Sequence, residues 1–113
     1  MIFHITDDTL YQQALDKGSY THPTLPELGF IHASRKNQLA GVIERFMPEV
    51  QEVMVLHLVE KRLGNSLKWE EVPDENATFP HIYASIPLEA IEDVSIHRRD
   101  AAGKFDFSGL PGN

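Results

Sequence analysis

The sequence predicts a single α+β domain, in which two N-terminal helices pack on a mixed or antiparallel, split β-sheet. The first half alternates short apolar strands with amphipathic helices, whereas the second half is a run of strand-like segments. A chain of 113 residues is long enough for one hydrophobic core and too short for two. We therefore expect one domain over residues 1–113, with residues 101–113 forming a tail that contains three glycines and one proline.

The N-terminal segment predicts a strand followed by a helix. Residues 2–6 predict a short strand, in which apolar Phe3 and Ile5 alternate with polar His4 and Thr6. Thr6 or Asp7 can cap a helix that runs to about Lys17, and Gly18 can end it in the left-handed conformation. The apolar stripe of this helix comprises Leu10, Tyr11, Ala14 and Leu15.

A second helix has the clearest pattern in the chain. Residues 19–28 contain two prolines and predict a loop, residues 29–34 predict a second strand, and Ser34 is placed to cap the helix that follows. Apolar residues then recur at a period of 3.6 until Pro48 ends the helix. They are Leu39, Val42, Ile43, Phe46 and Met47. We expect them to be buried together, so that Phe46→Ala costs ~3–5 kcal/mol.

The second half is expected to be mostly β. Residues 53–59 are apolar except for His57, which predicts a strand buried on both faces and makes His57 a core residue. The remaining segments are a hairpin strand over residues 67–72, an acidic loop over 73–78, and strands over 81–86 and 90–98.

Composition excludes several classes of function. Seventeen acidic against ten basic residues give a net charge of −7, so we expect no binding to nucleic acid as a polymer. The absence of cysteine excludes a disulfide framework and a thiol nucleophile. No apolar run reaches the ~20 residues of a membrane span and no signal peptide is evident, so we expect a cytoplasmic protein without a membrane partner. The oligomeric state stays open.

Three predicted strands repeat one polar pattern. Each has a histidine opposite its apolar column and a hydroxyl group two residues later. The pairs are His4 with Thr6, His32 with Ser34, and His81 with Tyr83. If the strands are neighbours on one face of a continuous sheet, these groups line a single cleft. Imidazoles can hydrogen-bond ribose hydroxyls and tyrosine can stack on a base, so the cleft suits a small nucleotide-like ligand.

Two further groups could complete such a site. Ser34 at a helix start, with Arg35 beside it, could hold phosphate. Glu70 lies on the strand face opposite Trp69, so it could point toward the cleft as a catalytic carboxylate. His22 and His97 are interpreted as surface residues in a loop and at a strand end.

Other interpretations of the histidines stay open. Each could be a structural residue whose second nitrogen is satisfied by a carbonyl group. The cleft could belong to a non-catalytic nucleotide- or metabolite-binding module. A third alternative, less favoured because no carboxylates are evident to orient the rings, is a zinc site made by His4, His32 and His81. Our leading expectation is therefore a site without metal.

Five blocks in a fixed order resemble the domain-of-unknown-function 952 family of small bacterial proteins. They are residues 2–6, Gly18 with Tyr20, residues 29–34 with Gln38, Trp69 with Glu70, and residues 79–83. The resemblance spans nearly the whole chain. It implies a fold similar to that of ADP-ribosyltransferases, in which a split β-sheet clamps NAD.

The resemblance also implies roles for individual residues. His4 matches a position that contacts ribose, His32 a position against the nicotinamide side, and His81 with Tyr83 the strand that bears the catalytic group. Many ADP-ribosyltransferases carry a catalytic glutamate where this chain has His81. Glu27 is separated from Gly29 by one residue, where the family pattern has a glutamate directly before the glycine. We expect an NAD-binding enzyme that acts on a ribosyl bond by stabilising an oxocarbenium ion.

Overall fold

Three antiparallel β-sheets form the framework of the computed structural model, which describes residues 1–112. The strand orders are β1-β4-β8, β2-β7 and β3-β6-β5. The strands are β1 (Ile2–Thr6), β2 (Ser19–Tyr20), β3 (Ile31–His32), β4 (Glu52–Leu58), β5 (Leu67–Val72), β6 (Ala77–Ile82), β7 (Ile86–Pro87) and β8 (Ile91–Arg98). The helices are α1 (Asp8–Lys17), α2 (Thr24–Leu28) and α3 (Leu39–Phe46). The predicted α+β class with antiparallel sheets is confirmed.

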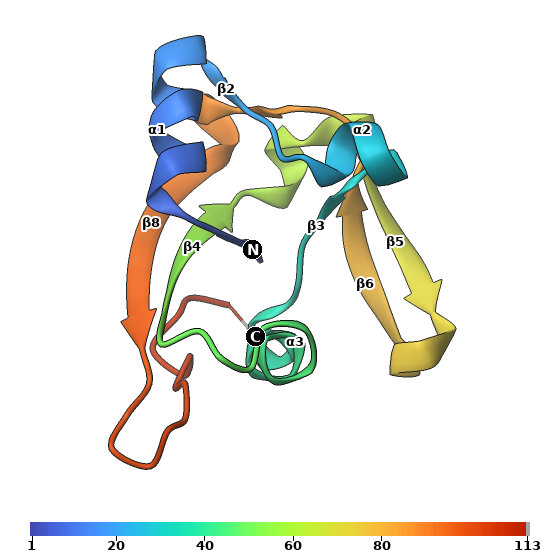
Figure 1. The fold of residues 1–113 in the computed structure, drawn as a ribbon. Helices are drawn as coiled ribbons and strands as arrows, with labels where there is room; N and C mark the ends of the chain where they lie inside the picture. The colour runs from blue at the N-terminus through green and yellow to red at the C-terminus, as the bar shows by residue number, and fades with distance from the viewer. Residues whose placement is uncertain (113) are drawn as a thin grey trace.

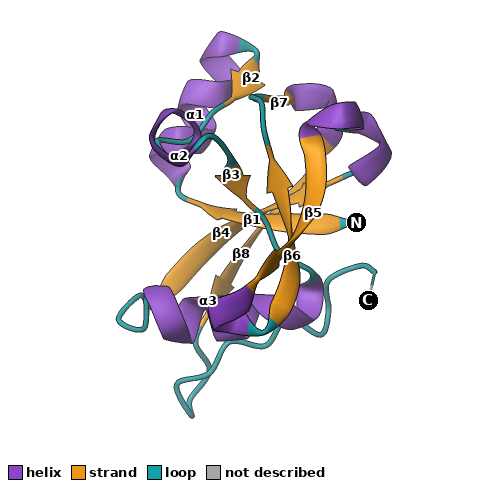
Figure 2. Ribbon diagram, turned by 90° about the vertical axis from the view of Figure 1, so that its right-hand side faces the viewer, coloured by secondary structure: helices purple, strands orange, loops and turns teal. Residues whose placement is uncertain are grey.

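The two three-stranded sheets are splayed apart and joined at one point. β4 and β8 lie on one side of the molecule, and β5 and β6 lie on the other (Figure 1). Phe3 and Ser34 form an isolated bridge between the sheets, with each backbone N–H donating to the other's carbonyl at 2.8 Å. Figure 2 shows α1 and α2 toward one end of the strands and α3 toward the other.

The first strand and helix form as the sequence predicts. Asp7 caps α1, because its carboxylate accepts a hydrogen bond of 2.8 Å from the Leu10 backbone N–H. Gly18 ends the helix with a φ of 87°, a left-handed conformation that is unfavourable for residues with a Cβ atom.

The predicted loop over residues 19–28 is instead partly ordered into β2 and the short helix α2. Tyr20 is fully buried and its strand pairs with β7, a partner that is remote in sequence. Pro23 and Pro26 do not prevent α2, because Pro23 is its N-cap and Pro26 lies in its first turn, where no intrahelical N–H bond is lost. The count of two N-terminal helices was therefore wrong.

The start of α3 also differs from the prediction. Ser34 does not cap a helix, because Arg35 is the N-cap of a 3-10 turn, Lys36–Gln38, and Gln38 in turn is the N-cap of α3. Gln38 stabilises that turn by accepting the Arg35 N–H at 2.9 Å. Leu39 and Ile43 are buried as expected, but Phe46 is 64% exposed. The expectation of a common burial is therefore wrong for Phe46, which lies at the end of the helix where the core stops.

β4 is the central strand of its sheet, and most of its residues are buried on both faces, as predicted. The predicted hairpin strand over residues 67–72 is confirmed as β5, and its hairpin partner is β6, with which it pairs along its whole length. β6 begins at Ala77 and ends at Ile82, so the predicted strand over residues 81–86 is displaced toward the N-terminus. Pro80 sits inside β6, where it donates no ladder hydrogen bond but its carbonyl accepts the Ala33 N–H at 3.1 Å.

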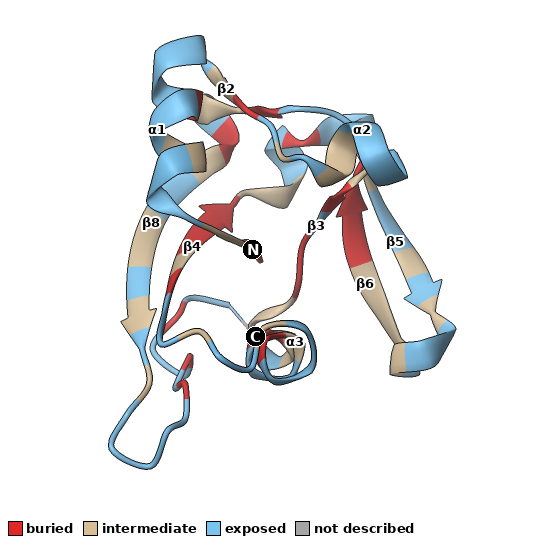
Figure 3. Cartoon of the chain, in the orientation of Figure 1, coloured by how far each residue is buried: buried red, intermediate tan, exposed pale blue. Residues whose placement is uncertain are grey.

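The C-terminal segment is part of the core. Phe105, Phe107 and Leu110 are buried against β1, α3 and β4, and the colouring of Figure 3 shows buried positions in this segment. Lys36 Nζ donates to three backbone carbonyls of this C-terminal segment and so connects it to the 3-10 turn before α3. Residues 101–112 are thus irregular but packed.

No helix in residues 1–112 combines the length and apolar character that crossing a bilayer requires.

Candidate functional site

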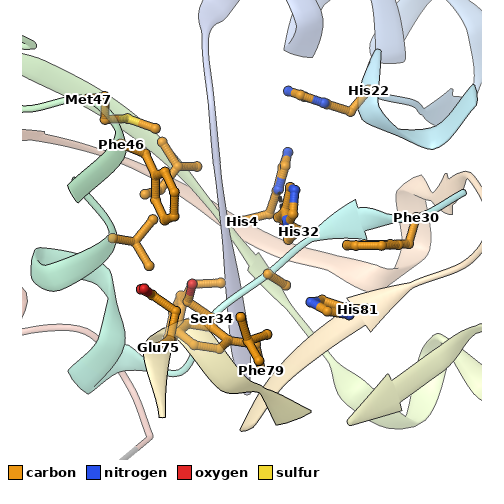
Figure 4. Close-up of a pocket in the computed structure, with 15 residues that line it drawn as sticks. His4, His22, Phe30, His32, Ser34, Phe46, Met47, Glu75, Phe79 and His81 are labelled. Atoms are coloured by element: carbon orange, nitrogen blue, oxygen red, sulfur yellow. Dashed lines mark hydrogen bonds between the residues drawn. The ribbon is translucent and has the colours of Figure 1, made fainter. Parts of the chain in front are cut away.

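A cavity of about 430 Å³ opens between β1, the β3–β6 pair and α3 (Figure 4). Its wall carries four histidines: His4, His22, His32 and His81. The other lining residues are Phe3, Ile5, Phe30, Ala33, Ser34, Val42, Phe46, Met47, Val72, Glu75 and Phe79. A mostly apolar wall with a few polar groups is typical of a small-molecule site.

The three histidines selected from the sequence line this one cavity. His32 and His81 are paired in the β3–β6 register, and their ring centroids are 5.8 Å apart. His4 comes from the other sheet, and the bridge between Phe3 and Ser34 brings its strand alongside β3. The expectation of one continuous sheet is wrong, because β1 and β3 share only that bridge.

His4 is fixed on both sides by hydrogen bonds. Its Nδ1–H donates to the His32 carbonyl at 2.5 Å, so Nε2 accepts the Tyr20 hydroxyl at 2.6 Å. The Tyr20 oxygen in turn accepts the Thr6 hydroxyl at 2.8 Å. Burial lowers the pKa of His4 to about 3 and raises the pKa of Tyr20. This neutral chain of bonds occupies both ring nitrogens of His4, and Thr6, at its other end, does not line the cavity.

The same bonds exclude His4 as a metal ligand, because neither ring nitrogen has a free lone pair. Within the described chain, no group of three His, Asp or Glu residues could hold a metal ion. The arrangement of the three histidines within residues 1–112 therefore gives the zinc alternative no support.

His81 is held by a carboxylate and an aromatic ring. Its Nδ1–H donates to Glu70 Oε1 at 2.9 Å, and Tyr83 donates its hydroxyl proton to the same oxygen. Both hydrogen bonds lower the pKa of Glu70, and the bond from Tyr83 has the larger effect. The same bond to Glu70 raises the pKa of Tyr83. Phe30 stacks on the imidazole with ring centroids 4.1 Å apart. Glu70 thus lies on the same face of β5 as the cavity-lining Val72 and contacts the cavity through His81, but neither Glu70 nor Tyr83 lines the cavity itself.

This arrangement leaves one nitrogen of His81 for chemistry. When Nδ1 carries the proton, Nε2 carries a lone pair, and Nε2 makes no hydrogen bond in the part of the chain that the structure describes. A carboxylate that orients an imidazole in this way is a common arrangement for general-base catalysis.

His32 and His22 complete the imidazole wall. His32 is the most exposed of the three predicted histidines, and partial burial followed by the proximity of His81 lowers its pKa. His22 was interpreted as a surface residue, but its ring lies 5.3 Å from that of His4, centroid to centroid. The Thr24 N–H donates to His22 Nδ1 at 3.1 Å, which orients the ring. Its spacing to Thr24 is the same His-x-hydroxyl pattern, a signal that could have found it.

The predicted phosphate site at Ser34 and Arg35 is not assembled. Ser34 lines the cavity, but Arg35 does not. The Arg35 guanidinium lies 4.6 Å from the centroid of the Trp69 ring and donates to the Thr78 carbonyl at 3.3 Å. Lys68 Nζ lies 5.5 Å from the centroid of the Tyr83 ring, and neither of these two residues lines the cavity.

The histidines outside the cavity form a separate network. His57 is buried, as predicted, and shares a hydrogen bond of 2.7 Å with Ser95. Ser95 is also 2.7 Å from Nε2 of His97, which is half-buried on β8. None of these three residues lines the cavity.

The fold and the cavity define a small antiparallel α+β protein with a histidine-lined cavity. The chain belongs to the family described as Protein of unknown function (DUF952), whose model matches residues 5–94. The family resemblance of the sequence blocks is thereby confirmed.

Solved structures share the fold. The crystal structure of protein CC0527 from Caulobacter crescentus is 24% identical, with a TM-score of 0.80 over 93% of this chain and 92% of that chain. The solution NMR structure of CC0527 is 24% identical, with a TM-score of 0.76 over 91% of this chain and 89% of that chain. No curated protein matches the chain.

Proposed function

We propose that the histidine-lined cavity is the active site of an enzyme that breaks the ribosyl bond of a nicotinamide nucleotide such as NAD. The observation that carries this proposal is His81, whose imidazole is oriented by Glu70 and stacked by Phe30 while its Nε2 remains available. The choice of substrate follows from the expectation, implied by the family resemblance of the sequence blocks, of a fold similar to that of ADP-ribosyltransferases.

The wall of the cavity supports binding of a nucleoside. Phe30 offers a planar surface for a nicotinamide ring, and the imidazole of His32 can donate to or accept from ribose hydroxyls. The Ser34 side chain lines the same wall and adds a further hydroxyl. Lys68 does not line the cavity, but a phosphate group that extends past the cavity wall toward the Tyr83 ring would meet its ammonium group.

In the proposed reaction, the bond between C1′ of the ribose and the nicotinamide nitrogen breaks, and nicotinamide leaves with the electron pair. Positive charge develops on the ribosyl ring, where the Glu70 carboxylate and the neutral imidazoles stabilise it. The hydroxyl oxygen of the attacking molecule forms the new bond to C1′, and His81 Nε2 accepts its proton. Glu70 stabilises the resulting imidazolium across the 2.9 Å hydrogen bond.

Calorimetric titration with NAD, its phosphorylated form and ADP-ribose, together with an assay of nicotinamide release, tests the proposal. We expect His81→Gln to lower the rate by about 10²–10⁴-fold, as loss of a general base does. His97→Gln is the matched control, since His97 lies on β8 outside the cavity. No binding of any of the three ligands would overturn the proposal, and binding without turnover would assign the cavity to a nucleotide-binding module instead.

A further inference from the structure

The cavity has an apolar end that the proposed ribosyl site does not use. We call it the apolar chamber and define it by Val42, Phe46, Met47, Val72 and Phe79. In Figure 4, Phe46 and Met47 lie across the cavity from Phe30 and His81. The cavity therefore has an imidazole end and an apolar end.

The chamber presents apolar surface that the fold itself leaves uncovered. α3 buries Leu39 and Ile43 in the core, but Phe46, on the next turn, is 64% exposed and lines the cavity. Val72 and Phe79, from the β5–β6 hairpin, are half-buried. Covering an exposed aromatic side chain and its partly buried apolar neighbours with a ligand removes apolar surface from water, which favours binding.

A single carboxylate provides the chamber with a polar anchor. Glu75 lines the cavity, and its Oε2 atom is buried. Arg45 Nε lies 2.6 Å from this oxygen and forms an ion pair with it, and Oε2 accepts no further hydrogen bond within the described residues. A buried oxygen with unused acceptor capacity favours a ligand that donates an O–H group to it.

We infer that the apolar chamber binds the acceptor of the ribosyl transfer, and that this acceptor is a small aromatic or alicyclic alcohol with a second O–H donor. This inference rests on the proposed function. The apolar ring packs against Phe46 and Phe79, and the second O–H group donates to Glu75. The nucleophilic hydroxyl points to the imidazole end, where its oxygen bonds to C1′, nicotinamide leaves with the electron pair, and His81 Nε2 takes the proton.

Binding is tested on the full chain with 4-(2-hydroxyethyl)phenol as the probe, followed by amide chemical shifts. We expect shifts at residues 42–47 and 72–79, and weaker binding of 2-phenylethanol, which lacks the phenolic donor. Phe46→Ala should weaken binding of the probe at least about fivefold because apolar contact area is lost. Ile96→Ala is the matched control, because Ile96 is similarly exposed at 58% but lies on β8 outside the cavity. Absence of probe shifts at the chamber would overturn the inference.

Product analysis separates this inference from the proposed function. With NAD and the probe together, mass spectrometry should detect the probe joined to ADP-ribose, and Phe46→Ala should reduce this product more than it reduces nicotinamide release. Nicotinamide release without the joined product would overturn the acceptor assignment while leaving the proposed function intact. Probe binding without any NAD binding would overturn the proposed function and the acceptor role with it.

Discussion

The hydroxyl of Tyr20 donates a hydrogen bond of 2.6 Å to Nε2 of His4, and both side chains are buried. This contact joins the end of β1 to β2, and it divides the histidines of the cavity by role. His4 has no nitrogen left for a ligand, whereas His81 does. The histidine that begins the sequence pattern is therefore structural.

His4 should make stability depend on pH. Burial lowers its pKa to about 3, whereas the unfolded chain binds a proton at the ordinary value of 6.5. The contribution of neutral His4 to the free energy of unfolding is complete above pH 6.5. As the pH falls from 6.5 toward 3, the free energy of unfolding decreases by roughly 1.4 kcal/mol per pH unit. Urea unfolding of wild type and His4→Gln at pH 7, 6 and 5 measures it. Equal pH slopes for the two proteins would contradict the assignment.

Tyr83 should set the acidity of Glu70. The hydrogen bond from Tyr83 is the largest cause that lowers the pKa of Glu70, followed by that from His81. We expect Tyr83→Phe to raise the Glu70 pKa toward its ordinary value, as measured by NMR of the carboxyl carbon. The stabilising effect of the lowered pKa is present above the unfolded value and is lost as pH falls through the folded one. Asp106, whose pKa is lowered by Ser108 in the C-terminal segment, is the internal control and should not change.

Replacing an apolar side chain of α3 by alanine should cost a different amount of stability at Ile43 than at Phe46. Ile43 is fully buried, so Ile43→Ala should cost ~2–5 kcal/mol through the cavity that it leaves. Phe46 is 64% exposed, so Phe46→Ala should cost below about 1 kcal/mol, in place of the larger loss that its helical spacing suggested. Denaturant melts of both variants give the comparison. A loss for Phe46→Ala as large as that for Ile43→Ala would show that the aromatic ring is part of the core.

The C-terminal segment should contribute to stability as a core element does. Phe107 is buried and its ring stacks on that of Phe105, with centroids 5.7 Å apart. We expect Phe107→Ala to lower the free energy of unfolding by ~3–5 kcal/mol. Lys104→Ala, at an exposed position of the same segment, should have almost no effect. Equal stability of the two variants in urea would mean that the segment does not pack in solution.

Arg35 should act on the hairpin and not on a ligand. Its guanidinium lies over Trp69, the single tryptophan of the chain. Arg35→Ala should change the fluorescence of Trp69 and cost about 0.5–1 kcal/mol, with no change in affinity for NAD. A salt-dependent loss of NAD affinity in Arg35→Ala would restore the phosphate role that the sequence suggested.

Much of the local structure could be predicted from the sequence. The first strand, its helix with Asp7 and Gly18 at the two ends, and the central strand β4 follow from side-chain period and capping chemistry. Both are properties of neighbouring residues. The displaced β6 shows the limit, because proline is typical of a strand break, whereas in the structure Pro80 pairs with Trp69 of β5 and its carbonyl accepts the N–H of Ala33, just after β3.

The sequence by itself determined which side chains are available for chemistry: the repeated histidine and hydroxyl pairs, and Glu70 on the face opposite Trp69. Only the tertiary structure decided which of these side chains have a donor or acceptor atom that no partner within the protein occupies. Tyr20 reaches His4 across 16 residues of sequence, Glu70 reaches His81 across 11, and Arg35 reaches Thr78 across 43. A ring nitrogen or a guanidinium is available to a ligand only when no partner within the protein occupies it, and such partners are fixed by strand pairing that local periodicity does not contain.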